Sequence, residues 1–336
     1  MPIKALGLLS GGLDSTLALR LIYDQGIEVI ALHFDAGFGL LDIKRPQGES
    51  SEVLAAARAL GVGVEVIDIS NGFLDLLHNP RYGYGKNVNP CVDCHIKMLH
   101  RSGELLERFG AQFVFTGEVL GQRPMSQNLA ALKLIARESG IEERILRPLS
   151  ALLLPPTLPE REGWVNRSKL KGFCGRSRKP QMALAAELGV VDYPQPAGGC
   201  SLTDPQYSRK VRDLWDHSAK NDLTWDDYLM LGIGRHIRLG PRSKIIVGRN
   251  ERENLLLDQH RKGRVRLEVE GFPGPVALMD GEMDDDILLR AAQIVARYSD
   301  GRDSPNELSV KIDIAGGEQR ILARAINPKD MQGLII

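Results

Sequence analysis

Six residues near the start of the chain have the types and spacing of an anion-binding loop. Residues 10–15 read SGGLDS and stand between an apolar stretch, 3–9, and an amphipathic one, 16–23. We therefore expect a strand, a glycine turn and a helix. The glycines allow a sharp turn and close approach to a ligand, and the helix start offers unpaired N–H groups and a positive dipole end. With the hydroxyls of Ser10, Ser15 and Thr16, the loop is predicted to hold a phosphate.

The cysteines form a second set of reactive side chains. Cys91 and Cys94 stand three residues apart in NPCVDCH, at a predicted helix start, which lowers a thiol pKa and favours thiolate. Thiolate is the form needed for sulfur chemistry and for binding a soft metal. One such pair is not a complete tetrahedral metal site, so further ligands would come from Cys174 or Cys200. The glycines before Cys200 would let it enter a crowded site.

Bulk properties limit the class of protein. At 336 residues, two domains are expected, and 43% hydrophobic with 26% charged residues is ordinary for a globular protein. The net charge is zero, so a nucleic-acid partner must be sought in local patches. No apolar run nears the roughly 20 residues of a membrane span. Because the first residues lead directly into a strand, we expect no secretory leader and a cytoplasmic location, where four cysteines indicate metal or redox chemistry.

The first half of the chain alternates short apolar strands with helices. This rhythm predicts an α/β fold, a parallel doubly wound sheet with helices on both faces. Ligands bind such sheets at the carboxyl ends of the strands. Residues 10–15, 35–39 and 117–127 are therefore expected to share one crevice. The predicted strands are 3–9, 28–34, 63–69, 112–116 and 144–146, and the predicted helices are 14–24, 47–60, 94–109, 126–138 and 180–188.

The second half has a different pattern. After the proline-rich residues 153–159 and the turn-rich residues 193–200, short strands and helices no longer alternate regularly. We place the boundary so that residues 1–204 form the first domain and 205–336 a second, smaller α+β domain. Its predicted helices are 207–215, 225–231 and 285–296, and its predicted strands are 237–239, 244–247, 264–268, 277–279, 308–312 and 320–325.

The loop at residues 10–15 has neither the Gly-Lys-Ser/Thr end of a Walker loop nor the third glycine of a dinucleotide fingerprint. It resembles the pyrophosphate loop (PP-loop) of the N-type ATP pyrophosphatases, which have an adenine nucleotide α-hydrolase-like fold. That family cleaves ATP between the α and β phosphates and activates an oxygen of a second substrate as an adenylate. The resemblance implies that Mg²⁺ lies near Asp14 and Asp35 near the ribose or adenine, and that ATP binds through Ser10, Gly11, Gly12, Asp14, Ser15 and Thr16. A capped helix after a glycine turn is the alternative.

Two further motifs resemble tRNA-modifying families. The NPCVDC segment, followed by Ile96 and Lys97, resembles the cysteine motif of bacterial tRNA 2-thiouridine synthases. Residues 116–122, TGEVLGQ, with SQ at 126–127, resemble a loop of the tRNA 4-thiouridine synthases, which implies nucleotide contacts for Gly117 and Gln122. Glu118, Gln122 and Gln127 could equally cap the predicted helix 126–138. Three motifs in the expected order over residues 1–200 imply a tRNA sulfurtransferase that adenylates a uracil oxygen and then transfers sulfur.

The resemblance leaves two modes of sulfur delivery open, a cysteine persulfide resolved by a second cysteine or a [4Fe–4S] cluster. We favour Cys91, Cys94 and Cys200 as cluster ligands and, with Asp14, as the catalytic residues. Cys174 could be a fourth ligand, the persulfide carrier or a buried small hydrophobe. A closed four-cysteine Zn²⁺ site would be structural instead.

The second domain contains a candidate RNA-binding segment. Residues 248–254, GRNEREN, resemble the signature of the NFACT RNA-binding domain. They lie in residues 235–266, where ten basic and three acidic side chains give a local charge of +7. Such a segment attracts phosphate, although a solvated basic face is a common alternative. The predicted RNA contacts are Arg235, Arg249 and Asn250, with Arg176, Arg178 and Lys179 from the first domain.

Two other functions use the same features. An amidotransferase or ligase of the NAD synthetase type would share the loop, but the cysteines and the basic segment argue against it. A non-catalytic ATP-binding RNA adaptor would share the second domain, but the intact loop argues against that. The partners expected for the favoured function are tRNA and a sulfur donor, either a protein or inorganic sulfide, without a membrane and with a homodimer as an option.

Overall fold

The computed structural model describes residues 2–38, 57–58, 60–190, 193, 200–314 and 317–336. These residues divide into two compact units, the first ending at Thr203 and the second beginning at Asp204. Each unit has its own sheet.

The first unit is built on a five-stranded parallel sheet. Its order is β3-β2-β1-β4-β5, with every neighbouring pair parallel, which confirms the predicted doubly wound α/β fold. The order reverses between β1 and β4, the position at which such sheets bind ligands. The strands are β1 (Lys4–Leu8), β2 (Glu28–Asp35), β3 (Gly63–Asp68), β4 (Phe113–Phe115) and β5 (Ile145–Leu146).

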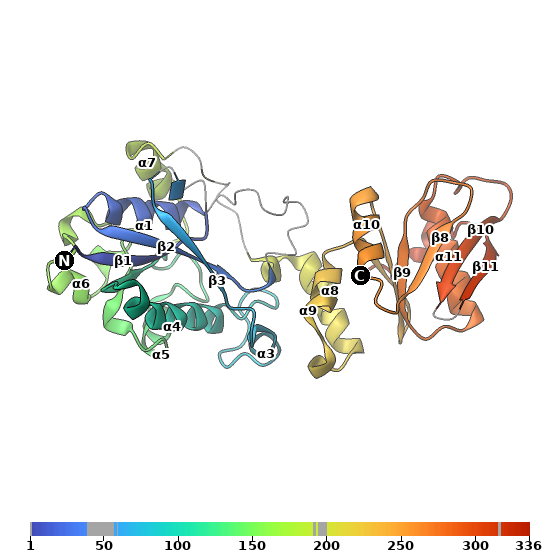
Figure 1. The fold of residues 1–336 in the computed structure, drawn as a ribbon, viewed down its shortest axis with the longest axis horizontal. Coiled ribbons are helices and arrows are strands. Elements are labelled where there is room, and N and C mark those ends of the chain that lie inside the picture. The colour runs from blue at the N-terminus through green and yellow to red at the C-terminus, as the bar shows by residue number, and fades with distance from the viewer. Residues whose placement is uncertain (1, 39–56, 59, 191–192, 194–199, 315–316) are drawn as a thin grey trace. The chain divides into compact units, whose positions relative to one another are not determined.

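Helices cover both faces of this sheet. Figure 1 shows α1 and α7 on one face and α4 and α5 on the other. Buried aliphatic and aromatic side chains, among them Leu17, Phe113 and Phe115, fill the core. The helices are α1 (Leu13–Tyr23), α3 (Phe73–His78), α4 (Cys91–Phe109), α5 (Leu129–Glu138), α6 (Leu158–Arg161) and α7 (Lys179–Glu187).

Among the predicted helices, the starts of α4 and α5 differ most from the prediction, by three residues each. Helix α4 begins at Cys91 and not at residue 94, because Pro90 is its N-cap and proline suits the entry to a helix. Helix α5 begins at Leu129 and not at 126, because the Asn128 side chain accepts a hydrogen bond from the Ala131 N–H and caps it. Both cysteines of the CxxC pair therefore stand in the first turn of α4. Most of the predicted helix 47–60 lies outside the described residues.

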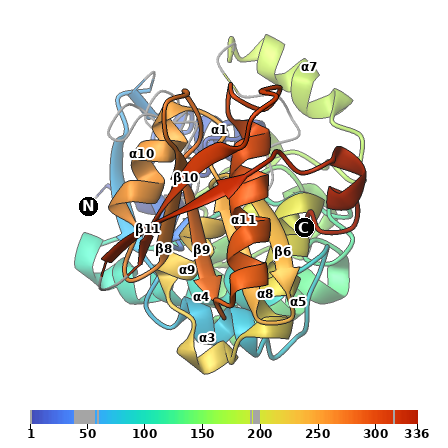
Figure 2. The same cartoon turned by 90° about the vertical axis from the view of Figure 1, so that its right-hand side faces the viewer.

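The second unit contains a six-stranded antiparallel sheet, order β11-β10-β8-β9-β7-β6, which confirms the predicted α+β module. Helix α11 lies across the sheet in Figure 2 and buries Ala291, Ala292 and Val295 against it. The strands are β6 (Arg235–Gly240), β7 (Ser243–Val247), β8 (Val265–Val269), β9 (Ala277–Gly281), β10 (Leu308–Ile314) and β11 (Gly317–Ala323). The helices are α8 (Pro205–His217), α9 (Trp225–Leu231), α10 (Glu251–Gln259) and α11 (Asp285–Tyr298).

Candidate functional site

The loop between β1 and α1 has the shape of an anion cradle. Gly11 has φ +78°, a left-handed conformation that favours glycine, and Gly12 is the N-cap of α1. The hydroxyls of Ser15 and Thr16 donate to the Gly12 carbonyl at 2.9 and 3.1 Å, and the Ser10 N–H donates to Ser15 Oγ at 3.3 Å. The predicted hydroxyl donors thus fix the loop. Backbone N–H groups of the first helical turn are left for a phosphate.

Asp14 is held by a relay of amide side chains. Gln181 Nε2 donates to Gln122 Oε1 at 2.8 Å, and Gln122 Nε2 donates to Asp14 Oδ2 at 2.7 Å. The other carboxylate oxygen, Oδ1, is buried without a hydrogen-bond partner in the described part of the chain. Buried polar atoms are almost always paired, and Mg²⁺ prefers carboxylate oxygens. The unpartnered oxygen therefore fits a Mg²⁺ ion that would arrive with a nucleotide.

A cavity of about 270 Å³ opens beside this loop, at the carboxyl ends of β1, β2 and β4. The loops after β1 and β4 both line it, as predicted for a shared crevice. Gly117 packs closely here, since a Cβ on it would lie 2.5 Å from the Ser15 nitrogen. Asp35 lies just outside the lining and accepts a hydrogen bond from the Gly37 N–H at 2.8 Å. The lining residues include Leu32, His33, Phe34, His95, Met98, Thr116, Glu118, Arg123, Gln127 and Arg178.

Three basic residues predicted as RNA contacts take different positions. Arg178, the N-cap residue of α7, lines the cavity with its guanidinium 3.7 Å from Asp14 Oδ2. Arg176 and Lys179 are exposed. Arg178 thus lies beside the phosphate loop, whereas Arg176 and Lys179 face solvent.

The three cysteines favoured as ligands lie in one neighbourhood. Burial raises the pKa of Cys94 to about 12, with further contributions from nearby Cys200 and Cys91. Burial also raises the pKa of Cys91, to which Ser126 hydrogen-bonds, and that of Cys200. The expectation that the helix start would favour thiolates is therefore wrong for the protein alone, because desolvation outweighs the helix dipole.

The geometry tests the two metal hypotheses differently. No three Cys, His, Asp or Glu side chains of the described residues are arranged to hold a single metal ion. A closed four-cysteine zinc site is likewise not present among these residues, in which Cys174 forms an isolated parallel bridge with Leu120. Three neighbouring thiols do fit an iron–sulfur cluster in type, because each thiolate ligates a separate iron and the three sulfurs need not converge on one ion.

Two contacts bring the cysteine segments together. The Asn87 side chain, from a residue with φ +61°, donates to the Thr203 carbonyl at 2.8 Å and so ties the segment after Cys200 to the loop before α4. Gly85 makes room for the first thiol, since a Cβ there would lie 2.7 Å from Cys91 Sγ. The first contact joins the segment that follows Cys200 to the loop that precedes Cys91, and the absence of a Cβ at Gly85 leaves space for the Cys91 thiol.

A buried charge network connects the cysteine helix with the cavity. Glu118 is 5% exposed and receives Arg147 Nε and Thr116 Oγ1 on one oxygen, at 2.9 and 3.0 Å, and His95 Nδ1 on the other at 2.9 Å. Burial opposes its ionisation, but Arg147 and His95 outweigh burial and lower the pKa of Glu118 to about 2. Arg147 was not among the predicted site residues, although it directly follows β5 and parallel sheets bind their ligands at such strand ends.

In the second unit, the predicted RNA contacts also organise the fold. The Asn250 side chain caps α10 by accepting from the Glu253 N–H at 3.0 Å, and Arg249 forms a forked ion pair with Glu253, with contacts from 2.6 to 3.0 Å. The Arg235 guanidinium lies 4.7 Å from the centre of the Tyr298 ring. RNA binding by these residues stays a prediction.

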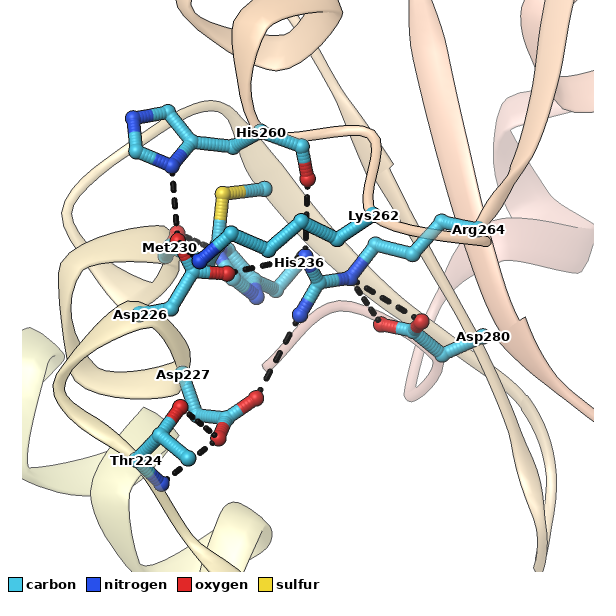
Figure 3. A network of polar contacts seen from close by, with 9 residues as sticks. All are labelled: Thr224, Asp226, Asp227, Met230, His236, His260, Lys262, Arg264 and Asp280. Atoms are coloured by element: carbon cyan, nitrogen blue, oxygen red, sulfur yellow. Dashed lines mark hydrogen bonds and ion pairs between the residues drawn. The ribbon is translucent and has the colours of Figure 1, made fainter.

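The local charge of +7 is reduced by acidic partners from outside the segment. Figure 3 shows Arg264 between Asp226, Asp227 and Asp280, at 3.1, 3.3 and 3.0 Å. Lys262 and His260 both contact Asp226, at 2.9 and 2.7 Å. Arg238 and Arg261 pair in the same way with Asp213 and Asp313. Counting charge along the sequence therefore overstated the positive field of this unit.

The parallel sheet and the glycine loop at its switch point have the arrangement expected of a PP-loop domain. Residues 2–152 match the family described as "Thiamine biosynthesis protein (ThiI)", and residues 234–333 match the "NFACT protein RNA binding domain". The first unit is thus similar to a family of PP-loop enzymes, and the second to an RNA-binding domain family.

Curated relatives match a part of the chain. A tRNA-specific 2-thiouridylase MnmA from Sulfurimonas denitrificans is 32% identical over 130 residues, which are 36% of this chain and 36% of the relative. A probable tRNA sulfurtransferase from Thermococcus kodakarensis is 28% identical over 150 residues, 44% of this chain and 37% of the relative. The chain therefore spans little more than a third of the length of these relatives.

Among solved structures, U34-tRNA thiolase NcsA from Methanococcus maripaludis with its [4Fe-4S] cluster has a TM-score of 0.29 and 16% identity, covering 68% of this chain and 69% of that one. The C-terminal part of a fibronectin/fibrinogen-binding protein from Streptococcus suis has a TM-score of 0.27 and 14% identity, covering 47% and 72%. None of the helices in the described ranges has the length and apolar character needed to cross a membrane.

Proposed function

We propose that this chain is a cytoplasmic, ATP-dependent enzyme that thiolates a uridine of tRNA. One observation carries the proposal: His95, which directly follows Cys94 on α4, lines the same cavity as Ser10 and Asp14 of the phosphate loop. A substrate base in that cavity could be reached both by an activated phosphate and by a sulfur carrier. The tRNA-modifying relatives of residues 2–152 support the same reaction.

In the first step, the ATP phosphates would bind the N–H groups at the start of α1. Arg178 would lie beside them, and Asp14 would hold Mg²⁺ through its unpartnered oxygen. The uracil oxygen attacks the α-phosphorus, so that a bond from oxygen to phosphorus forms and the bond to pyrophosphate breaks. The amide relay through Gln122 keeps Asp14 in position for this step.

In the second step, sulfur replaces the adenylated oxygen and AMP leaves. Cys91, Cys94 and Cys200 would hold a [4Fe–4S] cluster, which when bound would supply sulfur at an iron not ligated by cysteine. In the alternative, one of these cysteines carries a persulfide and another resolves it as a disulfide. Either version needs a sulfur donor, a protein or inorganic sulfide.

The second unit would supply tRNA affinity, because its residues 234–333 match an RNA-binding family. Its arginines would contribute salt-dependent attraction to phosphate. A homodimer is compatible with this scheme.

The test combines two measurements on the full chain. Mass spectrometry of tRNA nucleosides from a deletion strain should show one thiouridine missing, restored by the wild-type gene and not by Asp14→Ala. The purified protein should release pyrophosphate from ATP only when tRNA is present. Release that needs ammonia and ignores tRNA would favour amidation, and thiouridine levels unchanged by Asp14→Ala would favour the RNA adaptor.

A further inference from the structure

We propose that His95 selects uracil in the cavity by accepting a hydrogen bond from its N3–H through Nε2. This inference rests on the proposed function and names the residue that would distinguish uridine from cytidine.

The buried network fixes the form of the imidazole ring. Nδ1 of His95 lies 2.9 Å from Glu118 Oε1, and Glu118 is also held by Arg147 and Thr116. A carboxylate kept ionised by a guanidinium can only accept hydrogen bonds, so Nδ1 carries the proton. In the neutral ring, Nε2 then presents a lone pair. In the described part of the chain, Nε2 makes no hydrogen bond, and the side chain is 22% exposed.

The sheet order indicates which side of the cavity would hold the base. The phosphate loop follows the central strand β1, with β2 on one side of it and β4 on the other. The β2 side contributes Leu32, His33 and Phe34, whereas the β4 side contributes Glu118 and, from α4, His95. The CxxC cysteines stand on α4, next to His95 in the chain. A base that must meet both the α-phosphate and sulfur therefore belongs on the β4 side.

The chemistry of the base then accounts for the choice. Uracil presents an N3–H donor between two carbonyl oxygens, and cytosine presents a lone pair at N3. An acceptor at Nε2 of His95 can form a hydrogen bond with the N3–H of uracil. With cytosine, the lone pairs of Nε2 and N3 would face each other without a proton between them. A buried polar group left unpaired costs enough to weaken binding by roughly 10- to 100-fold.

Two isosteres separate this role from a structural one. In His95→Asn, the amide nitrogen takes the position of Nδ1, so the contact with Glu118 is kept and the group facing the cavity is lost. In His95→Gln, the side-chain amide reaches the position of Nε2, so its oxygen can accept from N3–H while the contact with Glu118 is lost. Thermal unfolding of both variants beside the wild type checks that the unit is folded.

The readout is tRNA-dependent pyrophosphate release by the full chain. We expect kcat/KM to fall roughly 10- to 100-fold in His95→Asn and to be largely restored in His95→Gln. Recovery by His95→Asn and not by His95→Gln would show that the histidine only supports Glu118 and would overturn the inference.

The second readout is specificity. Once the thiolated position is mapped, a transcript with cytidine at that position competes with the normal transcript. The wild type should prefer uridine, and His95→Asn should reduce this preference about tenfold or more. An unchanged preference would overturn the inference while leaving thiolation intact, whereas a wild type that releases no pyrophosphate with any tRNA would contradict the proposed function itself.

Discussion

Gln122 Nε2 donates a 2.7 Å hydrogen bond to Asp14 Oδ2 across 108 positions of sequence, joining the loop after β4 to the phosphate loop. This contact leaves the other oxygen of Asp14 buried and unpartnered among the described residues. The two glutamine side chains thus hold the Asp14 carboxylate in an orientation that leaves Oδ1 available to a bound ligand such as Mg²⁺.

Replacing Gln122 by leucine should disorient this carboxylate. Because small displacements of a reacting group are costly, we expect tRNA-dependent pyrophosphate release to fall roughly tenfold or more and to need more Mg²⁺. The matched control is Gln259→Leu, at an exposed position of α10. Equal rates in the two variants would contradict the positioning role of Gln122.

The contact between Gly117 and the phosphate loop gives a second prediction. A Cβ at Gly117 would lie 2.5 Å from the Ser15 nitrogen, where the neighbour is backbone and cannot move aside cheaply. Gly117→Ala should therefore weaken ATP binding and cost about 1–3 kcal/mol of stability, measured by nucleotide titration and thermal unfolding. Gly63→Ala is the control, since nothing lies within 4 Å of a Cβ at that position.

Glu118 predicts a pH dependence of stability. Its pKa is lowered to about 2 from an ordinary value of 4.5, so its contribution is complete above pH 4.5 and is lost as the pH falls toward 2. The difference corresponds to about 3 kcal/mol at most. Urea unfolding of the wild type should lose stability over this window, and Glu118→Gln should show a flatter dependence. Parallel curves for the two proteins would be evidence against the ionised, paired state of Glu118.

The cysteines give a prediction about metal content. After anaerobic reconstitution with iron and sulfide, the wild type should be coloured and contain both elements. Cys91→Ala and Cys200→Ala should lose them, because these thiols neighbour Cys94, whereas Cys174→Ala should keep them. A colourless, iron-free wild type would leave the persulfide version as the mode of sulfur delivery.

The network in Figure 3 predicts an effect on RNA binding. Asp226→Asn removes a carboxylate shared by His260, Lys262 and Arg264, so these groups should become available to phosphate. We expect the full chain to bind RNA with a salt dependence steeper by about one phosphate contact, and to be less stable. Asp216→Asn, at an exposed position of α8, should change neither property. The salt dependence is measured by fluorescence anisotropy.

The sequence was most informative where a pattern is local. The alternation of apolar runs and helices predicted all five strands of the first sheet, and strand ends predicted that residues 10–15 and 117–127 meet. Side-chain partners over long separations were not predictable in this way. Gln181 acts through Gln122, and nothing in its own sequence surroundings marks it. Arg147 stands at a strand end, but its pairing with Glu118, 29 positions away, is not visible in the sequence. The prediction of lowered thiol pKa values was wrong for the same reason. The burial of a thiol depends on how the whole unit packs, and the helix start alone does not reveal it.

Helix α10 was missed for a different reason. Its sequence groups three leucines, Leu255, Leu256 and Leu257, between charged residues, and only the last of these is fully buried. The usual helical spacing of apolar residues is therefore absent. The Asn250 cap was present in the sequence, and it was interpreted as part of an RNA signature.

Helix α9 lies outside the segment that matches the RNA-binding family, yet its Asp226 and Asp227 neutralise Arg264 within that segment. If the unit binds RNA, these two carboxylates would compete with the RNA phosphates for Arg264. A fragment that starts at residue 234 would lack both carboxylates, and we expect it to bind RNA more tightly than the whole chain. The boundary of the family match is therefore not the boundary of the electrostatic unit.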